Sequence, residues 1–217
     1  QPVKAPIMVQ NPLLPESIRP HLQSRRFGKI IHHFQETGST NDVARQLAEE
    51  SAPEGTLVLA EKQTEGPGRL GRSWLSERGA GIYASILFRP TLKPRDAAIL
   101  TLVAAVVAAV GIEQTCRRNA DIKWPNDLLL SGRKCCGILS EMQAERDEIR
   151  YVIVGIGINV NQAAFPEELG RRATSLRIEG GQAYSRVELL CALLLTFELL
   201  YDDLQQGNRS AVLKRWV

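Results

Sequence analysis

Cysteine and histidine are scarce in this sequence, with four cysteines and three histidines among 217 residues. No two cysteines are spaced as CxxC, and the histidines lie far from them along the chain, so the pattern offers no zinc-binding motif. Cys135 and Cys136 are adjacent in an apolar stretch, where we expect two small buried thiols rather than a disulfide. Unpaired cysteines are typical of a reducing compartment, so we expect a cytoplasmic protein.

Long apolar runs and charge of a single sign are missing as well. The longest uncharged run, residues 97–112, has 16 residues, whereas a membrane-spanning helix needs about 20. We therefore predict a buried core helix there and no membrane partner. Lysine and arginine number 27 against 24 acidic residues, and no basic tail indicates a nucleic-acid-binding surface. The first residue is not Met, so we expect a piece of a longer protein.

The order of the predicted elements favours an α+β fold. Proline-rich residues 1–28 are typical of a linker, and the capping boxes Ser39–Asp42 and Ser185–Glu188 predict helix starts. Several predicted strands follow one another with no helix between them, so we expect a mixed or antiparallel sheet backed by helices, not a doubly wound sheet. We place Arg117 and Arg118 in the last turn of the core helix, where the helix dipole favours cations. The predicted strands are 30–34, 56–60, 81–89, 121–124, 134–143 and 150–159, and the main helices begin at 39 or run over 95–118 and 186–206.

The segment from Gly66 to Trp74 has the most unusual composition in the chain. It carries three glycines together with Arg69 and Arg72, and so combines free backbone amides with guanidinium groups. Such groups bind phosphate well. The spacing is not that of a P-loop, and no GxGxxG opens a helix there, so neither nucleotide motif applies. The segment indicates phosphate or nucleotide binding, with an ordinary surface loop as the alternative.

Three further clusters combine polar residues or glycines with predicted strands. Lys123–Leu128 leaves a strand through Trp-Pro-Asn-Asp, and both a ligand site and an ordinary turn fit that pattern. Lys134 begins a buried strand that contains Gly137, and a surface lysine is the simpler interpretation. The run Gly155–Asn159 has two glycines, which weaken a strand unless another group must approach it closely. Its final asparagine is then a candidate ligand contact.

Together and in this order, these motifs closely resemble the catalytic domain of the bacterial biotin–protein ligase family. The likeness runs from about Ile31 to Trp216. It implies a fold like that of biotin and lipoate ligases and class II aminoacyl-tRNA synthetases. The matching segments are Gly38–Asn41 for the family's (G/D)STN, Gln63 ahead of the loop, Gly66–Trp74 for GRGRxGRxW, Lys123–Leu128 for KWPNDL, Lys134–Leu139 for KxxGIL and Gly155–Asn161 for GxGINxN.

The resemblance implies a ligase that works in two steps. ATP with Mg²⁺ would first activate biotin to biotinyl-5′-AMP, and a lysine of the biotin carboxyl carrier protein of acetyl-CoA carboxylase would then accept the biotin. Two anions meet in the first step, so cations are the main catalytic device. The residues implied as catalytic are Lys134, Arg69, Arg72 and Asp127. The residues that would ligate the metal stay unassigned.

The resemblance also implies two ligand subsites. The biotin-binding residues would be Ser39, Thr40, Asn41, Gln63, Pro67, Gly68, Arg69 and Lys134. The residues that bind ATP or the adenylate would be Arg69, Arg72, Trp74, Asn126, Lys134 and Asn159. Trp74 would cover the adenine ring, and the alternative role for Ser39 is that of a helix cap.

One departure from the family pattern is Pro67, which stands where the family has the first arginine of the loop. Proline has neither an amide hydrogen nor a positive charge, so we expect a changed main-chain contact to biotin and a loss of some phosphate affinity. A catalytically weakened ligase is therefore one alternative function. Two others are a biotin-sensing transcriptional regulator and a lipoate–protein ligase, although the glycine motif of the latter is absent here.

The resemblance further implies how the chain is divided. We expect residues 1–28 to be a linker, of the kind that follows an N-terminal winged-helix domain in many members, and residues 29–217 to be the catalytic domain. The small SH3-like barrel expected after Trp216 is absent from this sequence. DNA would be a partner only if an N-terminal domain is missing from this chain. Whether the protein forms a homodimer stays open.

Overall fold

A seven-stranded mixed sheet forms the centre of the computed structural model, which describes residues 12–208. The strand order is β1-β2-β3-β7-β6-β5-β4; β1 and β2 run parallel, and the other neighbouring pairs are antiparallel. This architecture confirms the predicted α+β fold. The strands are β1 Ile31–Phe34, β2 Leu57–Ala60, β3 Gly81–Phe88, β4 Asp121–Lys123, β5 Asp127–Leu130, β6 Arg133–Glu145 and β7 Glu148–Asn159.

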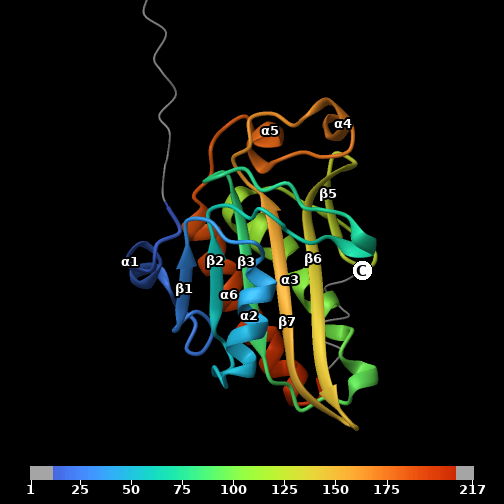
Figure 1. Ribbon diagram of the computed structural model, residues 1–217. Coiled ribbons are helices and arrows are strands. Elements are labelled where there is room, and N and C mark those ends of the chain that lie inside the picture. Colours follow the sequence, from blue (N-terminus) through green and yellow to red (C-terminus); the bar gives the residue numbers. More distant parts are fainter. Residues whose placement is uncertain (1–11, 209–217) are drawn as a thin grey trace, which may run out of the picture.

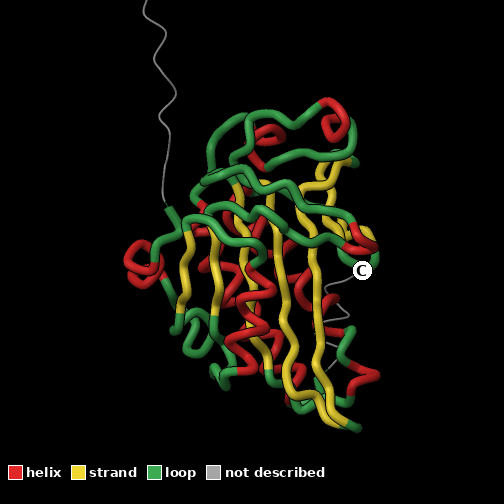
Figure 2. The backbone as a smooth tube through the Cα atoms, in the orientation of Figure 1, coloured by secondary structure: helices red, strands yellow, loops and turns green. Residues whose placement is uncertain are grey.

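Three long helices cover the two faces of the sheet (Figure 1). The helix α2 (Thr40–Glu49) lies on one face, over β2, β3 and β7, while α3 (Ile99–Cys116) and α6 (Arg186–Gln205) pack on the other. Figure 2 shows these helical layers in red against the yellow sheet. The shorter elements are α1 Pro15–Ile18, η1 Arg19–His21, η2 Arg69–Gly71, η3 Pro94–Asp96, α4 Glu167–Gly170 and α5 Leu176–Gly180.

The apolar run predicted as a core helix is confirmed as α3. Its composition would also suit a membrane span, but more than half of its most apolar window is buried, and it packs against α6 and the sheet. The predicted boundaries need correction. The helix begins at Ile99, because η3 forms a separate turn before it. It ends at Cys116, and the capping residue Arg117 has a φ of +52°, in the left-handed region, so the expected basic last turn is wrong.

The strand β5 is absent from the predicted elements. Trp124–Asn126 forms the turn of a β4–β5 hairpin, with Lys123 opposite Asp127 and a cis peptide bond before Pro125. The run of three leucines that follows is too short to stand out as a strand, and pairing with β6 decides its conformation. The hairpin places Asp127 beside β6, where it pairs with Gly137 and its carboxylate meets Lys134.

The described part of the expected linker contributes to the hydrophobic core. Leu13, Ile18 and Phe27 are fully buried in the same cluster as α3 and α6. Phe27 also packs edge-on against the Tyr201 ring, with the ring centroids 5.7 Å apart. Burying three large apolar side chains stabilises the fold by roughly 1.5–3 kcal/mol for each one.

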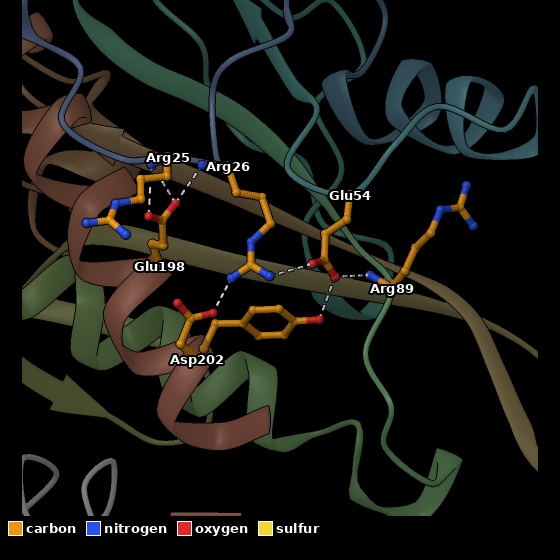
Figure 3. Close-up of polar contacts among 7 residues, drawn as sticks. Arg25, Arg26, Glu54, Arg89, Glu198 and Asp202 are labelled. Carbon is orange, nitrogen blue, oxygen red and sulfur yellow. Dashed lines mark hydrogen bonds and ion pairs between the residues drawn. The ribbon is translucent and has the colours of Figure 1, made fainter. Parts of the chain in front are cut away.

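Carboxylates on α6 and on the turn just before β2 bind the chain at Arg25 and Arg26 (Figure 3). Glu198 accepts the backbone N–H of Arg25 at 2.8 Å and that of Arg26 at 2.7 Å. The Arg26 guanidinium donates to Glu54 at 3.1 Å and also pairs with Asp202. Burial would raise the pKa of Glu198, but the backbone N–H groups around its carboxylate outweigh burial and hold that pKa below its ordinary value.

The two predicted buried thiols are confirmed. Cys135 and Cys136 are free and fully buried in β6. Burial raises the pKa of the Cys135 thiol to about 12, so the group stays protonated and unreactive at neutral pH.

Candidate functional site

A cavity lies on the α2 face of the sheet, near the N-terminal end of that helix. The segment from Gln63 to Trp74 borders it, together with strands β6 and β7. Most of the sequence-predicted site residues meet here. Those that line the cavity are Thr40, Asn41, Gln63, Pro67, Gly68, Arg69, Trp74, Asn126 and Lys134.

The first turn of α2 forms one wall of the cavity. Ser39 caps the helix, and its hydroxyl accepts from the Asp42 amide at 3.4 Å. The Gln63 Oε1 atom accepts two hydrogen bonds from Thr40, one from its amide at 2.8 Å and one from its hydroxyl at 3.0 Å. These two bonds fix which way the Gln63 amide points, and they leave its NH₂ group free to donate to a ligand.

Three glycines, Gly137 of β6 and Gly155 and Gly157 of β7, form a flat surface of the sheet beneath the cavity, which we call the shelf. Gly137 and Gly157 are paired across β6 and β7, and the Trp74 ring covers both. A Cβ atom would lie 2.8 Å from the Trp74 Cζ3 atom at Gly137 and 2.6 Å from its Cε2 atom at Gly157, closer than atoms can pack. At Gly155 a Cβ atom would lie 2.3 Å from the Asn41 Oδ1 atom. The close approach inferred from the glycine pattern is therefore that of two side chains of this protein.

The ammonium group of Lys134 lies at the edge of this shelf. Its Nζ atom is 2.7 Å from the Asp127 Oδ1 atom and 5.3 Å from the centroid of the Trp74 ring. Its backbone is fixed too, because its N–H donates to the Arg172 carbonyl at 2.8 Å and its carbonyl accepts from the Thr174 amide at 2.9 Å. A cation is thus held in place at the cavity while about a third of its side chain stays exposed.

The glycine–arginine loop folds into a small hairpin over the cavity. The Trp74 amide donates to the Gly66 carbonyl at 2.8 Å, and the Gly68 amide donates to the Arg72 carbonyl at 2.7 Å. Arg69 extends from its tip and donates to Asn126 Oδ1 at 3.2 Å. The hairpin therefore brings one of its two arginines to the β4–β5 turn.

Four predicted site residues do not line the cavity. Ser39 is used as the helix cap, and Asp127 reaches the cavity through Lys134. Arg72 is exposed and makes no side-chain hydrogen bond or ion pair with any residue from 12 to 208. Asn159 is buried, and its amide donates to the Thr174 carbonyl at 3.0 Å. It therefore supports the segment that fixes the Lys134 backbone.

Two polar residues beneath the cavity escaped the sequence analysis. Ser85 is fully buried in β3, where its hydroxyl contacts Thr40 and Asn41 at 2.8 and 2.6 Å. Glu141 of β6 accepts from the Asn41 amide at 2.6 Å. A serine in the middle of an otherwise apolar strand is a signal that could have pointed to the first of them.

A buried ion pair lies behind Gln63. Glu61, two residues earlier in the chain, accepts from Arg186 at 2.7 Å and from the Leu13 amide at 2.9 Å. Burial would raise the pKa of Glu61, but the Arg186 guanidinium outweighs it and holds that pKa below its ordinary value. Among the described residues, no three histidine, cysteine, aspartate or glutamate side chains come together as a metal site requires.

Comparison with known proteins gives consistent matches. Residues 33–159, more than half of the chain, match the model of the biotin/lipoate A/B protein ligase family. The chain is 43% identical to the bifunctional ligase/repressor BirA of Bacillus subtilis over 92% of its own length, but it spans only 62% of that relative. It is 34% identical to the biotin–[acetyl-CoA-carboxylase] ligase of Mycobacterium tuberculosis, over 91% of this chain and 74% of the relative.

The solved structures agree with the sequence comparison. The biotin protein ligase of Aquifex aeolicus in complex with biotin and ATP superposes with a TM-score of 0.70 at 33% identity, covering 82% of this chain and 72% of that one. The chain that carries this cavity and Lys134 is therefore similar to the same group of proteins in both sequence and fold. The chain belongs to the biotin/lipoate A/B protein ligase family.

Proposed function

We propose that this chain catalyses the ATP-dependent activation of biotin to biotinyl-5′-AMP and the transfer of biotin to a lysine of the biotin carboxyl carrier protein of acetyl-CoA carboxylase. The observation that carries the proposal is the Lys134 ammonium, held between Asp127 and the Trp74 ring at a cavity that also offers the Gln63 amide. The names of the Bacillus and Mycobacterium relatives and the two ligands of the Aquifex structure support it.

In the first half-reaction a biotin carboxylate oxygen attacks the α-phosphorus of ATP, and the bond to pyrophosphate breaks. Both reactants are anions, so the barrier falls when fixed positive charge lies between them. We assign this role to Lys134 and assign the grip on the phosphates to Arg69 and Arg72. The Arg69 guanidinium has one described partner, the neutral Asn126, so its charge is available to a phosphate.

Biotin recognition is assigned to the wall formed by α2 and the start of the loop. The NH₂ group of Gln63 and the Thr40 hydroxyl supply a donor and an acceptor for the ureido ring, and the apolar shelf suits its valeryl chain. Ser39 contributes by capping the helix that carries these groups. The remaining residues assigned to this subsite are Asn41, Pro67 and Gly68.

The adenylate is assigned to the other side of the shelf. We propose that Trp74 covers the adenine and that Asn126 contacts it, since both line the cavity. Stacking of a base on such a ring contributes about 1–3 kcal/mol. The contribution of Asn159 is indirect, through its hydrogen bond to the Thr174 carbonyl, which keeps the Lys134 backbone in place.

In the second half-reaction the amine of a lysine on the carrier protein attacks the acyl carbon of the adenylate, and AMP leaves. We assign Asp127 to holding the Lys134 ammonium in position during both steps. Mg²⁺ is proposed to arrive with ATP as part of the substrate. The carrier protein as partner, a cytoplasmic location and a catalytic unit that spans residues 29–217 after a linker are further parts of the proposal.

Biotin-dependent exchange of labelled pyrophosphate into ATP tests this function directly. The exchange reports adenylate formation alone, so it requires no carrier protein. We expect exchange with biotin, none with lipoate, and a large loss in the Lys134→Ala variant. Absence of exchange with biotin and ATP–Mg²⁺ would contradict the proposal.

A further inference from the structure

The strand β6 carries a β-bulge directly after Lys134. Leu128 of β5 pairs with Cys136, and the next residue, Leu129, pairs with Lys134, so Cys135 has no opposite residue on β5. Side chains of a regular strand alternate between the two faces of a sheet, and one extra residue breaks this alternation. The bulge therefore decides which face of the sheet the Lys134 ammonium reaches.

Both faces of the sheet show this effect. Cys135 and Cys136 are adjacent, yet both are fully buried in the core. Lys134 and Gly137, on either side of them, both line the cavity. A Cβ atom at Gly137 would lie 3.1 Å from the Lys134 Nζ atom, so the lysine side chain extends over the shelf. In a strand without the bulge, residues 134 and 137 would lie on opposite faces, and the ammonium group would be directed away from the cavity.

A two-residue turn sets the register of the β5–β6 hairpin. Leu130 pairs with Arg133 across Ser131, whose φ is +50°, and Gly132, whose φ is +74°. Left-handed backbone at both turn positions matches the twist of a hairpin, but this conformation is unfavourable for serine. The turn conformation and the pairing register depend on each other, so support for Ser131 also supports the bulge.

Glu179 of α5 supplies that support. Its Oε2 atom accepts from the Ser131 hydroxyl at 2.7 Å, and its Oε1 atom accepts from the Arg133 guanidinium at 2.7 Å and from the Thr174 hydroxyl at 2.6 Å. Within residues 12–208, these three side chains donate to no other group. Burial would raise the pKa of Glu179, but the hydrogen bonds from Thr174 and Ser131 and the Arg133 guanidinium outweigh burial and hold that pKa below its ordinary value.

The same carboxylate joins the residues on both flanks of Lys134. Arg133 precedes the lysine in β6, and the Thr174 amide donates to the Lys134 carbonyl at 2.9 Å. The lysine backbone thus lies between two residues whose side chains meet on one oxygen of Glu179. Glu179, Arg133 and Thr174 all lie outside the lining of the cavity, so this group acts on a ligand through Lys134 and not by contact.

We propose that Glu179 is a positioning residue for the formation of the adenylate: it holds the β5–β6 turn and the segment beside Lys134, and so keeps the ammonium group on the cavity face. The inference rests on the proposed function, because the role of Glu179 is exerted through Lys134. Placement of such a group affects the rate strongly, since a displacement of about 1 Å can cost about 100-fold. The groups assigned to biotin on α2 and Gln63 make no contact with Glu179, so affinity for biotin should be kept.

The test measures the rate constant for single-turnover formation of the adenylate in Glu179→Ala. We expect this constant to fall about tenfold, while the Kd for biotin, measured by titration calorimetry, changes less than about twofold. The rate constant is informative because a loss of folded protein lowers the amplitude alone. Glu179→Gln should recover most of the rate, since its amide oxygen can accept from Arg133 and Thr174 while its NH₂ group donates to the Ser131 hydroxyl.

A double-mutant cycle with Lys134→Ala separates this role from a merely structural one. Because Glu179 acts through the lysine, Glu179→Ala should lower the rate less than about twofold further once residue 134 is alanine. The matched control is Glu167→Ala, which removes an exposed carboxylate of α4 and should leave the rate unchanged in both backgrounds. Thr174→Val removes one hydrogen bond to Glu179 and keeps the charge, so it should lower the rate in the same direction even if Glu179→Ala does not fold.

The outcomes separate this inference from the proposed function. An unchanged rate in Glu179→Ala, or an equal fall in both backgrounds of the cycle, would overturn the inference alone. Failure of Glu179→Gln to recover the rate would overturn it as well, because charge and not placement would then set the rate. If Glu179→Ala does not fold, a normal rate in Thr174→Val has the same force. Absence of adenylate formation by the wild-type protein with biotin and ATP–Mg²⁺ would overturn the proposed function itself.

Discussion

Charged residues are used in opposite ways at the two ends of this molecule. Around Arg25 and Arg26, the carboxylates of Glu54, Glu198 and Asp202 each accept a hydrogen bond from one of these two arginines, so every one of them has a partner (Figure 3). We call this group the carboxylate clamp. At the cavity, Arg69 has one neutral partner.

The two regions differ in whether their charged and polar groups are satisfied by partners within the protein. In the clamp, donors and acceptors satisfy one another, so the net result is stability. At the cavity, positive charge and the NH₂ group of Gln63 exceed what the surrounding protein satisfies, so the remainder is available to a ligand. The comparison predicts that substitutions in the clamp alter unfolding, whereas substitutions at the cavity alter catalysis.

The largest effect is expected from Lys134→Ala. The ammonium group lies where charge develops between the two anions, and removal of one such group lowers the rate about 100- to 1,000-fold. Single-turnover formation of the adenylate measures this loss. The free energy of unfolding should change little, because the side chain is partly exposed.

The matched control for this substitution is Lys123→Ala. This lysine lies exposed on β4, before the turn that carries Asn126. Its removal should cost much less adenylation. Near-normal adenylate formation in the Lys134 variant would reject the assigned role.

The next effect is expected from Gly157→Ala, which tests the shelf. The added Cβ atom would lie 2.6 Å from the Trp74 ring, so the ring must move away from its position over β6 and β7. We expect affinity for the adenylate to fall about tenfold, equivalent to about 1.4 kcal/mol. Gly170→Ala is the control, because a Cβ atom added there would lie 4.0 Å from the Phe165 carbonyl oxygen, an ordinary van der Waals contact.

The clamp should show the opposite pattern in the variant Glu198→Gln. A carboxylate that accepts backbone N–H groups on both oxygens is replaced by an amide with one accepting oxygen, which should lower the free energy of unfolding by about 1–3 kcal/mol. Chemical denaturation measures the change, with Asp203→Asn on the same helix as the control. Pyrophosphate exchange at permissive temperature should keep its KM for biotin, and a raised KM would show that the two regions are coupled.

The smallest effect is the pH dependence of the same pair of proteins. The pKa of Glu198 is lowered in the folded state from its ordinary value of 4.5, so its stabilising contribution is present above that pH and is lost as the pH falls through the folded-state value. The difference in unfolding free energy between wild type and Glu198→Gln should therefore shrink as the pH is lowered from about 6 to about 3. A difference that stays constant over this range would contradict the assigned cause.

Local signals predicted much of the fold. The cap at Ser39 and the cap at Ser185 are confirmed, each accepting from the amide three residues later, because a helix start depends on neighbours in the sequence. Apolar stretches bounded by turn residues likewise predicted β3, β6 and β7. The strand β5 was missed because its conformation depends on pairing with β6, which no local pattern records.

The candidate site divides in the same manner. Its motifs lie at the ends of predicted elements, and nine of the residues drawn from them line a single cavity. Their individual surroundings were not predictable. Asn159 lies beneath the Lys134 segment instead of at the cavity, and Gly155 is a glycine because Asn41, more than a hundred residues earlier, occupies the space above it.

The sequence by itself determined the elements, the family motifs and the chemical types of group available, because these depend on residue identity and on spacing along the chain. Only the tertiary structure decided how those groups are partnered. It joins Glu141 of β6 to Gln63 through buried residues of α2 and β3, and it places Leu13 against Glu61. Donor direction and charge satisfaction depend on contacts between distant segments, and those contacts exist only after the sheet has assembled.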